Sequence, residues 1–129
     1  MNRRYPFQFL AALSAVSILG ASALAADAYP AKPIKIVVPY AAGGVVDVQT
    51  RALTQTMSEV LKTPIVVEAK PGASGSIAAE SVSQAAPDGY TLIVSASFLN
   101  AAPLLETNLR WSPKQFTPVG RFSLSPSYF

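Results

Sequence analysis

Three short apolar runs alternate with two amphipathic segments along the middle of the chain. The apolar runs cover residues 34–39, 65–68 and 90–95, and the first is apolar at nearly every position. Such a run is typical of a parallel strand in a sheet that is covered by helices on both faces. Between the runs, apolar residues recur at helical spacing over residues 47–61 and 76–84. The alternation predicts an α/β fold with a doubly wound parallel sheet.

Each predicted helix has one apolar side. The residues expected on these buried sides are Leu53, Met57, Val60 and Leu61 in the first helix, and Ile77, Ala78, Val82 and Ala85 in the second. Thr63 and Pro64 are expected to end the first helix. Beyond Ser95 the pattern weakens. Residues 101–105 suit a helical turn, residues 111–118 are interrupted by prolines, and residues 119–124 suit the start of a fourth strand.

The N-terminus has the pattern of a secretory signal. Arg3 and Arg4 form a basic head, residues 7–24 are mostly apolar or small, and Ala23-Leu24-Ala25 supplies a small-residue cleavage pattern. We therefore expect a signal peptide over residues 1–25, a mature segment over residues 26–129 and export to the periplasm. A retained membrane anchor is the alternative interpretation of the same apolar run.

The composition argues against several kinds of function. The chain contains no cysteine and no histidine, so we expect no disulfide, no metal centre and no histidine-based catalysis. The formal net charge of +3 includes Arg3 and Arg4, and lysine and arginine are scattered singly over residues 26–129, without the basic stripe that binds nucleic acids. The sequence also lacks the glycine motifs of nucleotide-binding loops. We therefore expect no cofactor and no nucleic-acid partner.

Two glycine-containing turns, at residues 39–47 and 68–76, each join a predicted strand to a predicted helix. Free backbone N–H groups and the positive end of the helix dipole favour carboxylates or phosphates at such a helix start. If the strand order is 2-1-3, the ligand crevice of a doubly wound fold would lie over residues 40–46 and 95–100. The sequence thus predicts an anion-binding site at the carboxyl ends of the strands.

Each candidate residue in these loops also has a purely structural interpretation. Gly43 and Gly44 can serve only the geometry of a tight turn. Asp47 can stabilise the first turn of its helix, or it can bind an ammonium group on a ligand. Ser95 and Ser97 can be solvated loop serines, or they can donate hydrogen bonds to a carboxylate. The residues by themselves leave both interpretations open.

Two other classes of function remain as alternatives. Residues 72–76 come close to the nucleophile elbow of serine hydrolases, with Ser74 as the nucleophile. However, Ser76 occupies the last glycine position of that motif, and the chain has no histidine to accept the proton. We therefore predict that the chain is not an enzyme. The other alternative is a periplasmic interaction or signalling module.

Four segments together resemble one protein family. Residues 29–47, 67–77 and 86–92 agree with it in sequence and spacing, and residues 116–119 resemble a further block. On these segments the chain resembles the substrate-binding proteins of tripartite tricarboxylate transporters, the Bug type. The resemblance implies a periplasmic protein with two α/β lobes, similar to type II binding proteins, that closes on a small carboxylate.

The resemblance also implies roles for single residues and partners. The N–H groups around the first glycine turn would hold a ligand carboxylate, and the serines after the third strand would line the cleft. The predicted ligand-binding residues are Gly43, Gly44, Val45, Asp47, Gly75, Ser76, Ser95 and Ser97. Family members are longer than this chain, so residues 26–129 are expected to form an incomplete N-terminal lobe. The expected partners are a small carboxylate and membrane transporter subunits, and the expected state is a monomer.

Overall fold

The computed structural model describes residues 28–123 and contains a three-stranded parallel sheet. The strands are β1 (Ile34–Val38), β2 (Ile65–Ala69) and β3 (Thr91–Ile93). Their order is β2-β1-β3, so the predicted order 2-1-3 is confirmed. Ile34 lies opposite Ile65 on one side of β1, and Lys35 lies opposite Thr91 on the other. The predicted signal segment, residues 1–25, lies outside the described residues.

β1 is the central strand, and its side chains are buried on both faces. Ile34, Val37 and Val38 are almost completely shielded from solvent. The continuous apolar run is therefore explained, because helices cover both faces of the sheet at this strand. Ile36 and Val38 belong to the core on the face covered by the first helix.

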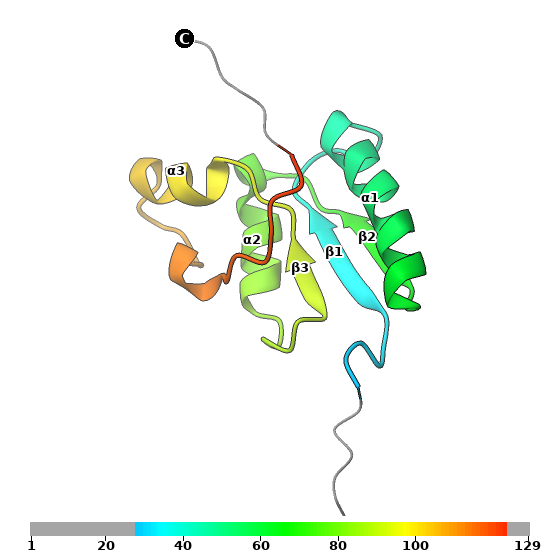
Figure 1. Ribbon diagram of the computed structural model, residues 1–129. Coiled ribbons are helices and arrows are strands. Elements are labelled where there is room, and N and C mark those ends of the chain that lie inside the picture. The colour runs from blue at the N-terminus through cyan, green and yellow to red at the C-terminus, as the bar shows by residue number, and fades with distance from the viewer. Residues whose placement is uncertain (1–27, 124–129) are drawn as a thin grey trace, which may run out of the picture.

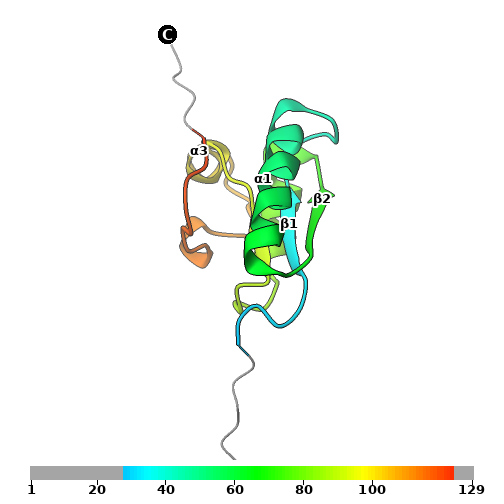
Figure 2. The ribbon, with the colours of Figure 1, turned by 45° about the vertical axis from the view of Figure 1, so that its right-hand side comes forward.

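Two helices cover opposite faces of the sheet (Figures 1 and 2). α1 (Val45–Leu61) packs on β1 and β2, and α2 (Ser76–Ser83) packs on β1 and β3. The opposite faces follow from the strand order. The crossover from β1 to β2 runs in one direction and the crossover from β2 to β3 runs back, and both are expected to be right-handed. α1 ends as predicted: Lys62 has a left-handed conformation, and Thr63 and Pro64 follow it.

The predicted buried side of α1 is wrong in part. Val60 is 75% exposed, whereas the buried positions of the helix are Asp47, Thr50 and Thr54. Polar residues can occupy this face because their hydroxyl groups find acceptors within the helix. Thr50 Oγ1 donates to the carbonyl of Val46, and Thr54 Oγ1 donates to a carbonyl one turn earlier.

The predicted buried side of α2 is also wrong in part. Ala78 is fully buried as expected, but Ile77 is exposed. Ala79, which was not predicted, is buried instead and packs against the C-terminal part of the described chain. Two adjacent alanines therefore form the buried contact of this short helix, which brings its backbone close to the neighbouring elements.

The segment after β3 forms a small second core. α3 (Phe98–Leu105) begins three residues earlier than the predicted helical turn, and a short 3₁₀ helix, η2 (Pro113–Gln115), follows it. Trp111 is 6% exposed and lies between the rings of Phe98 and Phe116, at centroid distances of 6.4 and 5.9 Å. This core lies on the β3 side of the sheet, next to α2 (Figure 1).

The predicted fourth strand is wrong for the part of it that the structure describes. Residues 119–123 are irregular and exposed, while residue 124 lies outside the described range. A strand requires backbone hydrogen bonds to a neighbour, and this segment has no ladder partner among residues 28–123. Its apolar character alone was therefore not sufficient to make it a strand.

Candidate functional site

Three loops leave the carboxyl ends of the strands at one edge of the sheet (Figure 1). Residues 39–44 lead into α1, residues 70–75 lead into α2, and residues 94–97 lead into α3. All eight predicted ligand-binding residues lie in these loops or in the first turns of the helices that follow. The parallel strand order brings them to the same edge, where doubly wound folds bind ligands.

The N–H groups of the two glycines in the β1–α1 loop already donate hydrogen bonds within the protein. Gly43 has a left-handed φ of 79°, and its N–H donates to Asp47 Oδ2 at 2.9 Å. The Gly44 N–H donates to the Ala41 carbonyl at 3.1 Å. The two glycines therefore shape the turn, and their N–H groups are directed inward.

The first turn of α1 carries the N–H groups that remain available at this loop. The first backbone hydrogen bond of the helix runs from the Val48 N–H to the Gly44 carbonyl. The N–H groups of Val45, Val46 and Asp47 therefore have no acceptor within the helix. Val45 is the first helical residue and is 75% exposed. Among the predicted residues of this loop, Val45 has the N–H that a ligand could reach.

Asp47 lies beneath the loop and is only 2% exposed. Its Oδ2 accepts from the Gly43 N–H and from Arg51 Nε, both at 2.9 Å. Its Oδ1 has no hydrogen-bond partner among residues 28–123. The hydrogen bond from Arg51, followed by the bond from Gly43, lowers the pKa of Asp47 against the opposing effect of burial. Asp47 is therefore ionised at neutral pH, and Arg51 balances its charge.

The β2–α2 loop has an unusual run of left-handed residues. Gly72, Ala73, Ser74 and Gly75 all have positive φ, at 128°, 44°, 51° and 96°. The Gly75 N–H donates to the Gly72 carbonyl at 2.9 Å and closes the turn. A Cβ at Gly75 would lie 2.9 Å from two atoms of the Phe98 ring. This contact joins the β2–α2 loop to the start of α3.

The three predicted serines have different surroundings. Ser76 begins α2, and its Oγ is buried without a hydrogen-bond partner among residues 28–123. Ser95 and Ser97 are exposed. Ser95 Oγ donates to the carbonyl of Ala96, and the Ser97 side chain makes no capping bond to α3. Ser95 and Ser97 are thus accessible at the edge of the sheet, whereas the hydroxyl of Ser76 is enclosed.

The eight predicted ligand-binding residues do not include two residues that organise this edge, Arg51 and Phe98. Arg51 follows Asp47 by four residues, a spacing that places oppositely charged side chains together on a helix. That signal was present in the sequence. Phe98 contacts Gly75 across 23 positions of the chain, and no local pattern could have indicated the contact.

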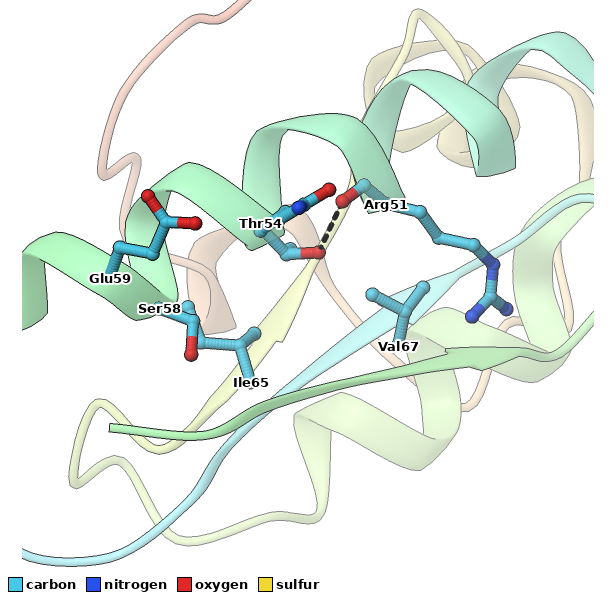
Figure 3. A pocket seen from close by; sticks show the side chains of 7 residues that line it. Arg51, Thr54, Ser58, Glu59, Ile65 and Val67 are labelled. Atoms are coloured by element: carbon cyan, nitrogen blue, oxygen red, sulfur yellow. Dashed lines mark hydrogen bonds between the residues drawn. The ribbon is translucent and has the colours of Figure 1, made fainter. Parts of the chain in front are cut away.

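A surface hollow of about 460 Å³ lies elsewhere, between α1 and β2 (Figure 3). The residues that line it are Arg51, Thr54, Gln55, Ser58, Glu59, Ile65 and Val67. None of the eight predicted ligand-binding residues contributes to it, and Arg51 alone connects it to the site. Within residues 28–123 there is also no cluster of side chains able to hold a metal ion, and no helix there could cross a membrane.

Comparisons with known proteins agree with this arrangement. Residues 49–128 match the model of the tripartite tricarboxylate transporter family receptor. The chain is 32% identical over 124 residues to a UPF0065 protein of Bordetella pertussis. That match covers 95% of this chain but 38% of the relative, so the chain spans little more than a third of the relative's length.

Solved structures are similar as well. The periplasmic binding protein BugD is 40% identical, with a TM-score of 0.62 over 66% of this chain and 28% of BugD. MatC of Rhodopseudomonas palustris, solved with bound malate, is 38% identical, with a TM-score of 0.60 over 70% of this chain and 32% of MatC. The sheet and its helices correspond to part of a lobe of such proteins. The chain therefore belongs to the tripartite tricarboxylate transporter receptor family of Bug-type solute-binding proteins, whose members are not enzymes.

Proposed function

We propose that this chain forms part of one lobe of a periplasmic protein that captures a small carboxylate for a tripartite tricarboxylate transporter. The observation that carries this proposal is the exposed start of α1, where Val45 begins the helix behind a turn shaped by Gly43 and Gly44. Unpaired N–H groups and the helix dipole favour a carboxylate there. The malate bound to MatC supports the same ligand class.

The proposal includes the other loops at the same edge. Ser95 and Ser97 would donate hydroxyl hydrogen bonds to the ligand. Gly75 is buried against the Phe98 ring and would shape the β2–α2 loop without touching the ligand. The Ser76 N–H already donates to the Ala73 carbonyl, so Ser76 would contribute by fixing the start of α2 beside the ligand rather than as a free donor. The transporter subunits and the monomeric state belong to the proposal on family grounds.

Export is part of the proposed function. Residues 1–25 would direct the chain to the periplasm and would then be removed. Mass spectrometry of the chain purified from the periplasm of a bacterial host tests this step. The expected product begins at Ala26, and a product that retains residues 1–25 in the membrane fraction would favour the retained anchor.

Ligand binding is best tested by NMR, because contacts from a single lobe would be weak. Malate added to the ¹⁵N-labelled chain should shift the amide signals of Val45, Ser76 and Ser97. The signal of Gly89, in the loop that leads into the amino end of β3, should stay in place. Equal shifts at Gly89 and at the three sites, or none at the three sites up to tens of millimolar malate, would contradict the proposal.

A proline at position 45 removes one ligand donor with little damage to the helix. Proline is favoured at the first helical position, and Gly44 already has the extended conformation that a following proline requires, with φ −70° and ψ 165°. Val45→Pro should therefore weaken malate binding about tenfold, the effect of one hydrogen bond to a charged group. Val45→Ala keeps the N–H and should change affinity less than about twofold. Equal affinities for the two variants would count against the assigned donor.

A further inference from the structure

The first turn of α1, which we assign to the binding of an anionic ligand, itself contains a carboxylate, that of Asp47. Asp47 is the third residue of α1 and is almost fully buried. A buried negative charge at this position would repel a second carboxylate, and burial strengthens that repulsion because little water screens it. The site therefore requires a feature that offsets the charge of Asp47.

Arg51 offsets the charge of Asp47. The Asp47 carboxylate in turn serves as the hydrogen-bond acceptor for the Gly43 N–H. Asp47 Oδ2 accepts from Arg51 Nε and from the Gly43 N–H at the same distance of 2.9 Å. The first bond neutralises the charge, and the second ties the left-handed turn to the helix. Arg51 extends from α1 on the side where Val67 of β2 lies (Figure 3).

We propose that Asp47 is the positioning residue of the β1–α1 loop and that Arg51 prevents its charge from opposing a bound carboxylate. The inference rests on the proposed function, because it concerns the same ligand site. Asp47 acts through Gly43: it turns the glycine N–H inward, so that the N–H groups at the start of α1 are the ones that face the ligand. Arg51 acts through Asp47 and needs no contact with the ligand.

Substitutions at the two positions separate these roles. Asp47→Asn keeps an oxygen acceptor for Gly43 and removes the negative charge, so malate affinity should stay within about threefold of the parent chain. Asp47→Ala removes the acceptor as well, so affinity should fall about tenfold. The ¹⁵N relaxation of Gly43 and Gly44 should also show increased motion in Asp47→Ala and parent-like values in Asp47→Asn.

The role of Arg51 is tested by a double-mutant cycle. Arg51→Gln should weaken malate binding about fivefold, because it leaves the charge of Asp47 unbalanced. In the Asp47→Asn background the same substitution should have almost no effect, since there is no charge left to balance. Lys62→Gln is the matched control: it removes one positive charge at the other end of α1 and should leave affinity unchanged.

Three results would contradict the inference or the proposed function. An equal loss on Arg51→Gln in both backgrounds would mean that Arg51 acts on the ligand directly, and it would overturn the inference while the proposed function stands. Unchanged motion of Gly43 in Asp47→Ala would overturn the positioning role without any ligand measurement. Failure of the parent chain to bind malate would overturn the proposed function and this inference together.

Discussion

Gly75→Ala tests how the β2–α2 loop is held against α3. Gly75 has a φ of 96°, and the added methyl group would lie 2.9 Å from the Cδ2 and Cε2 atoms of Phe98. The left-handed backbone costs a residue with a Cβ about 1–2 kcal/mol. Displacing the Phe98 ring from its preferred rotamer adds about 0.5–1.5 kcal/mol. The lower chain entropy of alanine in the unfolded state returns about 0.4–1 kcal/mol. The expected net loss in the free energy of unfolding is therefore about 2 kcal/mol.

Alanine substitutions at two other glycines separate the backbone contribution to this loss from the contribution of the Phe98 contact. Gly89 has a φ of 81°, but a Cβ there would meet the Tyr29 ring only at 3.4 Å. Gly89→Ala should therefore cost the backbone contribution alone, a net loss of about 0.5–1 kcal/mol. At Gly120 a Cβ has no atom within 4 Å, and its φ is not left-handed. Gly120→Ala should change stability by less than about 0.5 kcal/mol.

Urea unfolding followed by tryptophan fluorescence is the appropriate assay. Trp111 is the single tryptophan of the chain, it is buried, and it packs edge-on against Phe98. The emission therefore reports both global unfolding and the displacement of the Phe98 ring. The reasoning requires a lower midpoint at an unchanged urea dependence, together with altered emission of folded Gly75→Ala. A Gly75→Ala loss no larger than that of Gly89→Ala would refute the contact between the two elements.

The remaining predictions concern backbone strain and pH. Ser74 has a left-handed backbone, with a φ of 51° and a ψ of 30°. Ser74→Gly should raise the free energy of unfolding by about 0.5 kcal/mol, because the relief of backbone strain exceeds the entropy that glycine adds to the unfolded chain. A lower urea midpoint would contradict this. Acid should destabilise the fold. The pKa values of Asp47, Glu68 and Asp88 are lowered, chiefly by hydrogen bonds from Arg51, Lys70 and Lys32 respectively. A lowered pKa contributes stability that is present above the unfolded-state value of about 4 and is lost as the pH falls through the folded-state value. Urea midpoints measured from pH 7 to pH 3 should be level above about pH 5 and fall below about pH 4, less steeply in Asp47→Asn. Midpoints that stay level down to pH 3 would show that these ion pairs do not lower the carboxyl pKa values.

Much of the fold could be predicted because its signals are local. The apolar runs at β1 and β2, the helical spacing between them and the glycine-containing turns after the strands each lie within a few neighbouring positions. The alternation of strand and helix then restricts the connections to right-handed crossovers, from which the parallel sheet follows. The eight predicted ligand-binding residues came to one edge of the sheet for the same reason.

The errors arose where apolar character was taken as burial. Val60 and Ile77 are exposed although they are apolar, whereas Thr50 and Thr54 are buried although they are polar. Burial depends on which side of a helix meets the sheet, and Val119 shows the same limit for a strand without a partner. Sequence periodicity approximates these relations but does not determine them.

The sequence by itself therefore determined the order of the elements, the parallel sheet and the position of the glycine turns, because these follow from local backbone preferences. Only the tertiary structure decided which groups in those turns face outward. It directed the N–H groups of Gly43 and Gly44 inward, buried Asp47 beneath the loop, and set Gly75 against Phe98. These relations depend on hydrogen-bond directions and on contacts between distant segments, which exist only once the chain has packed.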